Sequence, residues 1–201
     1  LLTTGAQDAQ RMTGLFRVYD LLVQIDPMHP CVAISNSPET LAQLRHAADI
    51  LCLSLPMDEA QIGIPALSAS ELNDLLQEAR KAAGTHPLWL APPATRLAQV
   101  DPVLTFNAGV PNLNRLRYLN YWALLSGAQG IIAQACVQEK MAPGALNAYL
   151  ELLGPELTMI SPVVHDGKIL QKPVREPCIG VWDTSEGLWV IALNNQPVSV
   201  K

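Results

Sequence analysis

The sequence has no run of lysine or arginine and carries little charge of either sign. Charged residues make up 15% of its 201 residues, and the formal net charge is −5. Proteins that bind nucleic acid or an anionic lipid surface need a basic patch that attracts phosphate groups. We therefore expect no nucleic acid and no lipid surface among the partners of this chain.

The sequence also lacks a long apolar segment and an initiator methionine. No uninterrupted apolar stretch approaches the roughly 20 residues that span a bilayer, and Leu1 is followed by neither a basic region nor the apolar core of a signal peptide. We therefore expect no membrane partner. Because the chain starts at Leu1, it reads as a processed or excised fragment, and this end does not reveal its compartment.

Sequence motifs for phosphate and metal chemistry are missing as well. The chain has no GxGxxG, no GxxxxGKS or GxxxxGKT, and no GxSxG, which disfavours a nucleotide-dependent enzyme and an α/β hydrolase. None of the cysteines pairs with another at the spacing of metal ligands or redox motifs. We interpret them as buried thiols, with a disulfide left open for an exported protein: Cys31, Cys52, Cys136 and Cys178. No metal and no cofactor is expected.

The chain is rich in apolar sequence, arranged as alternating helices and strands. Hydrophobic residues make up 49% of it, enough to bury a large core. Short, continuous apolar runs are typical of parallel strands covered on both faces, and they occur at 31–35, 50–56, 88–92 and 130–135. Helical spacing predicts five helices before, between and after these strands. Three of them cover residues 8–25, 68–84 and 145–160, the last with a break near Gly154-Pro155. The other two are a helix that starts at Pro38 behind the capping residue Ser37 and a helix through Arg117. The fold class is therefore α/β.

The pattern changes after His165. Asp166-Gly167 reads as a turn, and residues 179–195 read as two strands joined between Thr184 and Gly187 in a hairpin. An isolated hairpin is marginally stable at best, so these strands are too few to bury a core of their own. We therefore expect two parts: residues 1–165 with the four strand and helix units, and residues 166–201 as the start of an all-β domain.

Five spaced segments carry a family resemblance: Tyr19 followed by DPMHP at 26–30, Asp49 to Pro56, Trp89, the stretch RYLNYWALLSGAQGII at 117–132, and residues 156–163. Together they are similar to the C-terminal half of the TIM-barrel glycoside hydrolases that carry a β-sandwich domain behind the barrel. The resemblance implies half of an eight-stranded (β/α)8 barrel, followed by the first strands of a β-sandwich. Four strands cannot close such a barrel, so the remainder of the barrel or a second copy of the chain must complete it.

This resemblance implies a carbohydrate-active protein that binds an oligosaccharide or polysaccharide. Glycoside hydrolases cleave their substrate by acid/base catalysis with two carboxyl groups, and barrel enzymes place such groups at the carboxyl ends of strands. The acidic residues nearest to those positions are the catalytic candidates: Asp8, Asp58 and Glu59. Polar and aromatic residues near the strand ends are the candidates for substrate binding: Asn36, Trp89, Gln134 and Glu139.

Both sets of candidates have plainer explanations. Loop carboxylates such as Asp58 and Glu59 can be solvated charges, and Trp89 can pack in the barrel core instead of stacking on a sugar. The strand that carries the nucleophile in retaining relatives ends here in Ala91-Pro92-Pro93, without a carboxylate. A non-catalytic polysaccharide-binding or structural homologue is therefore the alternative to a hydrolase, and part of any active site lies outside this chain. If the resemblance holds, a location outside the cytoplasm is favoured.

Overall fold

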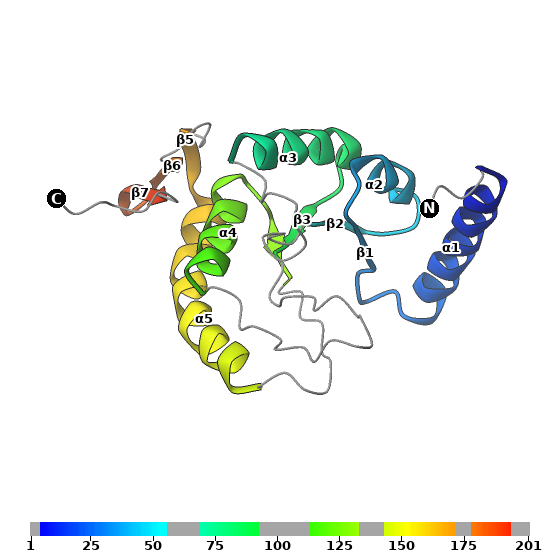
Figure 1. The fold of residues 1–201 in the computed structure, drawn as a ribbon, viewed down its shortest axis with the longest axis horizontal. Helices are drawn as coiled ribbons and strands as arrows, with labels where there is room; N and C mark the ends of the chain where they lie inside the picture. The colour runs from blue at the N-terminus through cyan, green and yellow to red at the C-terminus, as the bar shows by residue number, and fades with distance from the viewer. Residues whose placement is uncertain (1–4, 56–68, 93–112, 133–142, 172–177, 194–201) are drawn as a thin grey trace, which may run out of the picture.

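The computed structural model describes residues 5–55, 69–92, 113–132, 143–171 and 178–193. Helices and strands alternate along most of the chain (Figure 1). The helices are α1 (Gly5–Ile25), α2 (Pro38–Leu44), α3 (Ala69–Ala83), α4 (Leu113–Leu125) and α5 (Pro143–Asp166). The strands are β1 (Val32–Ser35), β2 (Ile50–Ser54), β3 (Leu88–Ala91), β4 (Gly130–Ile131), β5 (Lys168–Gln171), β6 (Cys178–Thr184) and β7 (Gly187–Leu193).

Strands β1 to β4 form a parallel sheet in which the spatial order follows the chain order, β1-β2-β3-β4. Each strand is joined to its neighbour through one helix, α2, α3 or α4. A second sheet is antiparallel and has the order β5-β6-β7. The predicted α/β class is confirmed in this form: one parallel sheet with crossover helices and one separate antiparallel sheet. None of the helices in the described ranges is both long and apolar enough to cross a membrane.

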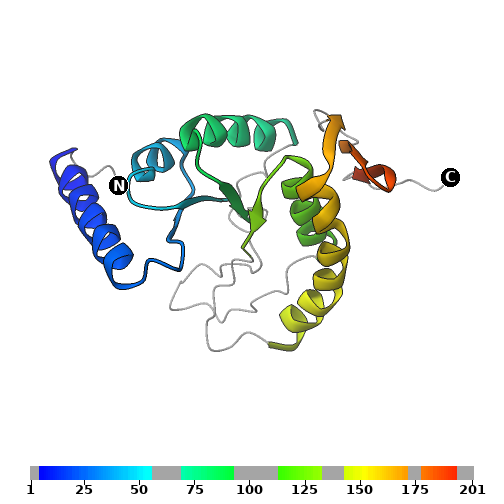
Figure 2. The ribbon, with the colours of Figure 1, turned by 180° about the vertical axis from the view of Figure 1, so that it is seen from behind.

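One face of the parallel sheet is covered by helices. The register aligns Leu51 with Leu88 and Leu53 with Leu90, so these leucines share a face. All four are buried in one cluster with apolar residues of α2, α3 and α4 at helical spacing: Leu41, Leu44, Leu72, Leu76, Ala79, Leu119 and Trp122. Figures 1 and 2 show these helices as an arc along one side of the sheet.

The opposite face of the sheet is also apolar. The register places Ile34, Cys52, Trp89 and Gly130 in one row across the four strands. The indole of Trp89 lies against Gly130, because a Cβ added at Gly130 would be only 2.5 Å from Trp89 Cε2. On β1, Val32 and Ile34 are 37% and 47% exposed. Helices α2, α3 and α4 therefore cover one apolar face. We refer to the opposite face as the uncovered face, because no crossover helix in the described ranges packs on it, although Cys52 on that face is itself fully buried.

Helix α1 is held on the sheet by a hydrogen-bonded carboxylate just before β2. The Tyr19 hydroxyl donates to Asp49 Oδ1 (2.7 Å), and the backbone N–H of Cys31 donates to Asp49 Oδ2 (2.7 Å). The Cys31 N–H, followed by the Tyr19 hydroxyl, stabilises the ionised carboxylate and lowers the pKa of Asp49. The same contact raises the pKa of Tyr19 to about 12. Tyr19 and Asp49, which both belong to the family-like segments, thus have structural roles.

Helix α4 ends at a turn that α3 stabilises. Arg80 donates from Nη2 to the carbonyl oxygens of Ser126 (3.2 Å) and Gly127, which places its charge at the negative end of the α4 dipole. Gly127 has a φ of 82°, a left-handed conformation that glycine adopts readily at helix ends. Burial lowers the pKa of the Arg80 guanidinium. The turn leads directly into β4.

Helix α5 runs without interruption from Pro143 to Asp166, so the predicted break near Gly154-Pro155 is wrong. Both Pro155 and Pro162 lie inside this helix. Each proline removes one backbone donor and favours a kink, but burial of the apolar side stabilises the continuous helix, because tertiary packing overrides local propensity. The buried residues on α5 are Leu153, Ile160 and Val163.

The predicted hairpin is confirmed, because β6 and β7 pair antiparallel with Thr184 opposite Gly187. Strand β5, which pairs with β6, was not predicted from the sequence. Trp182 on β6 is 2% exposed and belongs to the same buried cluster as α4. Gly180 allows this approach, since a Cβ there would be 2.5 Å from Leu125 Cδ2. The antiparallel sheet therefore shares its core with the α/β part. The division between residues 165 and 166 stays a prediction.

Replacing Gly130 by alanine tests the packing of the uncovered face. We expect Gly130→Ala to lower the free energy of unfolding by about 1–3 kcal/mol, because the new methyl group overlaps the Trp89 ring. Urea unfolding followed by tryptophan fluorescence measures the change. The control is Gly14→Ala on α1, where no atom lies within 4 Å of the new methyl group; we expect it to stabilise the protein by about 0.5–1 kcal/mol. Equal effects of the two variants would contradict this packing.

Asp49 predicts a specific dependence of stability on pH. Because the folded state lowers the pKa of Asp49, its contribution is present above its unfolded pKa, about 4, and is lost as the pH falls through the lower folded pKa. At pH 7 we expect Asp49→Asn to cost about 1 kcal/mol, with a difference from the wild type that disappears in acid. Asp74→Asn, at an exposed position of α3, is the control and should show no such pH-dependent difference in urea unfolding.

Candidate functional site

The carboxyl ends of the parallel strands are the edge at which ligands bind in sheets of this kind. The strands end at Ser35, Ser54, Ala91 and Ile131. Helices α2, α3 and α4 begin at the same edge, because each follows a strand and returns along it. Among the described residues, the polar side chains at the strand ends are Ser35, Asn36 and Ser54.

Asn36 is the predicted binding residue that the structure places at this edge. It stands between the end of β1 and the start of α2 and is exposed. Its position continues the alternation of Val32 and Ile34, which puts it on the uncovered face of the sheet. Its amide group can both donate and accept hydrogen bonds, as recognition of a sugar hydroxyl requires.

The start of α2 places a carboxylate, Glu39, three residues after Asn36, and this residue is not among the predicted candidates. Ser37 is the N-cap, as predicted, and its Oγ accepts from the Thr40 N–H (3.2 Å). The same hydroxyl donates to Glu39 Oε2. The hydrogen bond from Ser37, followed by the backbone N–H of Glu39, lowers the pKa of Glu39. Glu39 is therefore ionised at neutral pH and suited to accept a proton or hydrogen bond, not to act as a general acid.

Glu39 was missed because Ser37-Pro38-Glu39 has the sequence of an ordinary helix start. An acidic residue in the first turn of a helix stabilises it by interaction with the helix dipole. That structural role explains Glu39 without any ligand. The signal that could have identified it is its position three residues after Asn36, since both follow the carboxyl end of one parallel strand.

Trp89 lies away from this edge. It occupies the same row as Ile34 and Cys52 on the uncovered face, whereas Asn36 lies beyond the end of β1. The indole is half-buried against Gly130 and lines a cavity of about 930 Å³ between the sheet and α5. This cavity is bordered by residues at the amino ends of the strands, including Ile50, Pro87 and Ala128. Asn36 is not among the described residues that line this cavity.

The remaining candidates lie outside what the structure describes. Asp8 belongs to the first turns of α1, but its side chain is not described. Asp58 and Glu59 follow β2 outside the described residues, and Gln134 and Glu139 follow β4 in the same way. Their predicted roles stay predictions. At the described positions that directly follow β1 to β4, no carboxylate occurs: Asn36, Leu55, Pro92 and Ile132.

Cys52 is not a reactive group of this site. Cys31 and Cys52 are free thiols, and Cys52 is fully buried. Burial raises the pKa of the Cys52 thiol to about 12, so it is protonated at neutral pH and unsuited to nucleophilic attack. Within the described ranges, no three His, Cys, Asp or Glu side chains gather closely enough to hold a metal ion.

Comparisons with protein-family models, with curated proteins and with solved structures found no match for this chain.

Removing the Ser37 hydroxyl tests the electrostatics at this edge. We expect Ser37→Ala to destabilise the protein by about 1 kcal/mol through loss of the helix cap. The pKa of Glu39 should rise toward the ordinary glutamate value, since its main stabilising hydrogen bond is gone. Urea unfolding and an NMR titration of the Glu39 carboxyl group measure the two effects. Ser70→Ala, at an exposed position of α3, is the control that should leave the Glu39 titration unchanged.

Proposed function

We propose that this chain is part of a carbohydrate-active protein of the glycoside hydrolase type, in which the carboxyl edge of the parallel sheet forms one side of the sugar site. The observation that carries the proposal is the strand order. In a doubly wound sheet the order reverses near the centre and helices cover both faces. Here the order β1-β2-β3-β4 follows the chain, and the crossover helices share one face, as in consecutive units of a (β/α)8 barrel.

The segment that carries most of the family resemblance supports a scaffold role. Arg117 on α4 donates to both carboxylate oxygens of Glu156 on α5, from Nε to Oε2 (3.0 Å) and from Nη2 to Oε1 (2.8 Å). The Tyr121 hydroxyl also donates to Oε2 (2.9 Å). The bond to Glu156 raises the pKa of Arg117, and burial followed by Glu156 raises the pKa of Tyr121. These residues connect α4 to α5. The candidates for catalysis and sugar binding therefore remain those near the strand ends.

In the catalytic form of the proposal, two carboxyl groups flank the scissile bond, one protonated and one ionised. Asp8, Asp58 and Glu59 are the candidates for one of them, and at least one group comes from outside this chain. Glu39 is a further carboxylate near the edge, and its lowered pKa restricts it to an ionised role. Asn36, Gln134 and Glu139 are the candidates for hydrogen bonds to the sugar.

The second candidate function is a polysaccharide-binding protein without hydrolytic activity. It is favoured by Asn36 and Pro92, which stand directly after β1 and β3, where a barrel hydrolase can place catalytic carboxylates. An amide group binds sugar hydroxyls but does not replace an acid or a nucleophile.

Affinity electrophoresis in gels that contain soluble polysaccharides tests the proposal. We expect at least one neutral polysaccharide to retard the chain, and Asn36→Ala to weaken the apparent affinity about tenfold, the loss of one hydrogen bond of about 1.4 kcal/mol. The matched control is Gln43→Ala, which removes an exposed amide from α2 and should leave the retardation unchanged. A chain that no polysaccharide retards would contradict a carbohydrate function.

A reducing-end assay with the same polysaccharides separates the two candidates. Release of reducing sugar that Asp58→Asn or Glu59→Gln abolishes supports the hydrolase. Retardation without any release supports the binding protein. In both cases the effect of Asn36→Ala on affinity places the sugar at the carboxyl edge.

A further inference from the structure

Each outer strand of the parallel sheet has one free edge in the described part of the chain. Strand β1 pairs with β2 and strand β4 pairs with β3, and neither has a second described neighbour. A free edge presents backbone N–H and C=O groups that pair readily with another strand. The edges are thus able to accept one further strand each.

The helix layer is incomplete at the same two places. Each of α2, α3 and α4 connects two adjacent strands and packs over them. Helix α1 precedes β1, and helix α5 follows β4, so each of these end helices has a described strand on one side only. Figure 1 shows α1 and α5 at opposite ends of the arc of helices. In a singly wound sheet, a helix at this position covers the gap between two strands.

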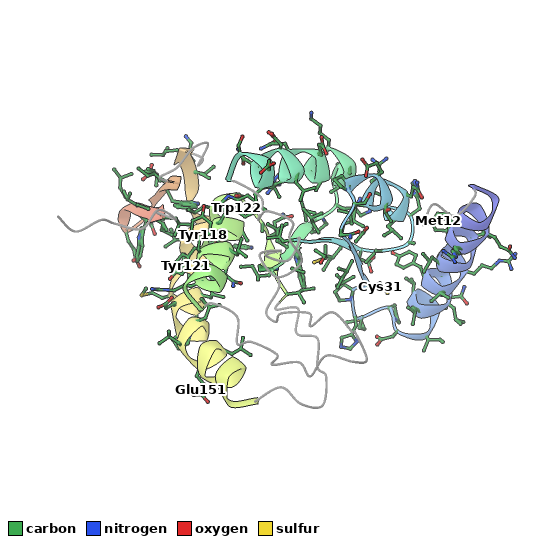
Figure 3. The ribbon with its side chains drawn as sticks, in the orientation of Figure 1. Met12, Cys31, Tyr118, Tyr121, Trp122 and Glu151 are labelled. Carbon is green, nitrogen blue, oxygen red and sulfur yellow. The ribbon has the colours of Figure 1, made fainter. Side chains whose placement is uncertain are left out.

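Helix α1 presents an apolar stripe to solvent on a flank next to the side that faces the sheet core. Its inward side is occupied: Met12 packs against the core and lies toward α2 (Figure 3), Phe16 lies edge-on to His46 at 6.5 Å between ring centroids, and Tyr19 bonds Asp49. The stripe consists of residues at spacings of three and four, which are between 45% and 72% exposed: Leu15, Val18, Leu22 and Ile25. A continuous stripe of this kind is typical of a helix face that packs on another element.

At the other edge, the cavity of about 930 Å³ separates β4 from α5. Its sheet side and its helix side are lined by Trp89, Gly130, Ile131, Leu157, Ser161 and Val164. A neighbouring strand lies about 4.8 Å from the strand it pairs with, so the amino end of a strand added to β4 would border this space. The bonds of Arg117 and Tyr121 to Glu156 hold α5 in place beside it. Because Ile50 and Pro87 also line the cavity, it extends from the space between β4 and α5 along the amino ends of β2 and β3.

A second copy of the chain does not fit these edges. If β1 of a second copy paired with β4, the α1 helix of that copy would arrive at the same seam, because α1 is tied to the start of β2 through Asp49. Helix α5 already occupies the layer there, and packed helices need about 8–10 Å between their axes. Two copies would bring ten of the described helices to eight parallel strands, which is one helix too many at each seam.

We propose that a different polypeptide unit, one that begins and ends with a β-strand, covers both edges. Its first strand pairs in parallel with β4 beneath α5, and its last strand pairs in parallel with β1 beneath the apolar stripe of α1. For a closed eight-stranded barrel the unit holds four strands and three helices. This inference rests on the half-barrel of the proposed function but not on its sugar chemistry.

Hydrogen exchange of the chain alone is the first test. We expect the backbone amides of β1 and β4 to exchange at least tenfold faster than those of β2, and the chain to self-associate with rising concentration in size-exclusion chromatography with light scattering. Leu22→Glu, in the α1 stripe, should reduce this association. Leu188→Glu, at a position of β7 that is 67% exposed, is the matched control and should not reduce it.

Two outcomes of this experiment would overturn the inference. One is a monodisperse monomer in which β1 and β4 are as protected as β2. The other is a discrete dimer in which both edges are protected, since that would make a second copy the occupant.

A fusion protein is the second test. A right-handed crossover would lead from the last strand of the proposed unit through α1 into β1, so the fusion joins the unit to the chain at Leu1. We would fuse there a designed half-barrel of four parallel strands and three helices that starts and ends with a strand, and compare it with a tandem fusion of two copies of the chain. We expect only the half-barrel fusion to be monomeric and to slow exchange of β1 and β4 at least tenfold. Protection by the tandem copy instead would refute the inference.

The polysaccharide assay tests the carbohydrate function independently of this inference. A fusion that protects both edges but binds no polysaccharide upholds the missing unit and rejects the carbohydrate function. If a polysaccharide retards the chain alone, and β1 and β4 are already protected in a monomer, the carbohydrate function is upheld and the missing unit is rejected. If the half-barrel fusion fails to fold, exchange in the chain alone still decides the state of the edges.

Discussion

Burial of one leucine layer, between the parallel sheet and the helices α2, α3 and α4, is the interaction on which the remaining structure depends. Leu51, Leu53, Leu88 and Leu90 pack on the helices from one face only. Because parallel strands alternate their side chains, the other face must carry the remaining residues of the same apolar runs. The sheet is therefore apolar on both faces, but its crossover helices cover only one of them. This asymmetry determines which further packing contacts the two outer strands need.

Polar contacts position the elements around this layer. Asp49 fixes α1 through Tyr19, Arg80 fixes the end of α4, and Glu156 fixes α5 through Arg117. Exposed ion pairs contribute little to stability on average, but these contacts define where the two end helices stand relative to the sheet. The residues of the family-like segments thus act mainly on architecture.

Much of the fold followed from local patterns. Continuous apolar runs predicted the four parallel strands, and Ser37-Pro38 predicted the start of α2, because strand burial and helix capping depend on neighbouring residues. The continuous helix α5 was not predicted, since Pro155 breaks the local pattern and only burial of Leu153 and Ile160 compensates for it. Strand β5 was missed because a short strand has little signal before its partner β6 is known.

The candidate site followed from the sequence only in part. The sequence by itself determined the alternation of strands and helices and the position of Asn36 at a strand end, because periodicity and chain order encode both. The tertiary structure alone decided that Trp89 lies against Gly130 instead of beside Asn36, that Glu39 is held ionised near the carboxyl edge, and that α1 and α5 stand at opposite ends of the arc of helices. The physical reason is that these properties depend on strand register and on contacts between residues distant in the chain, which local spacing does not specify.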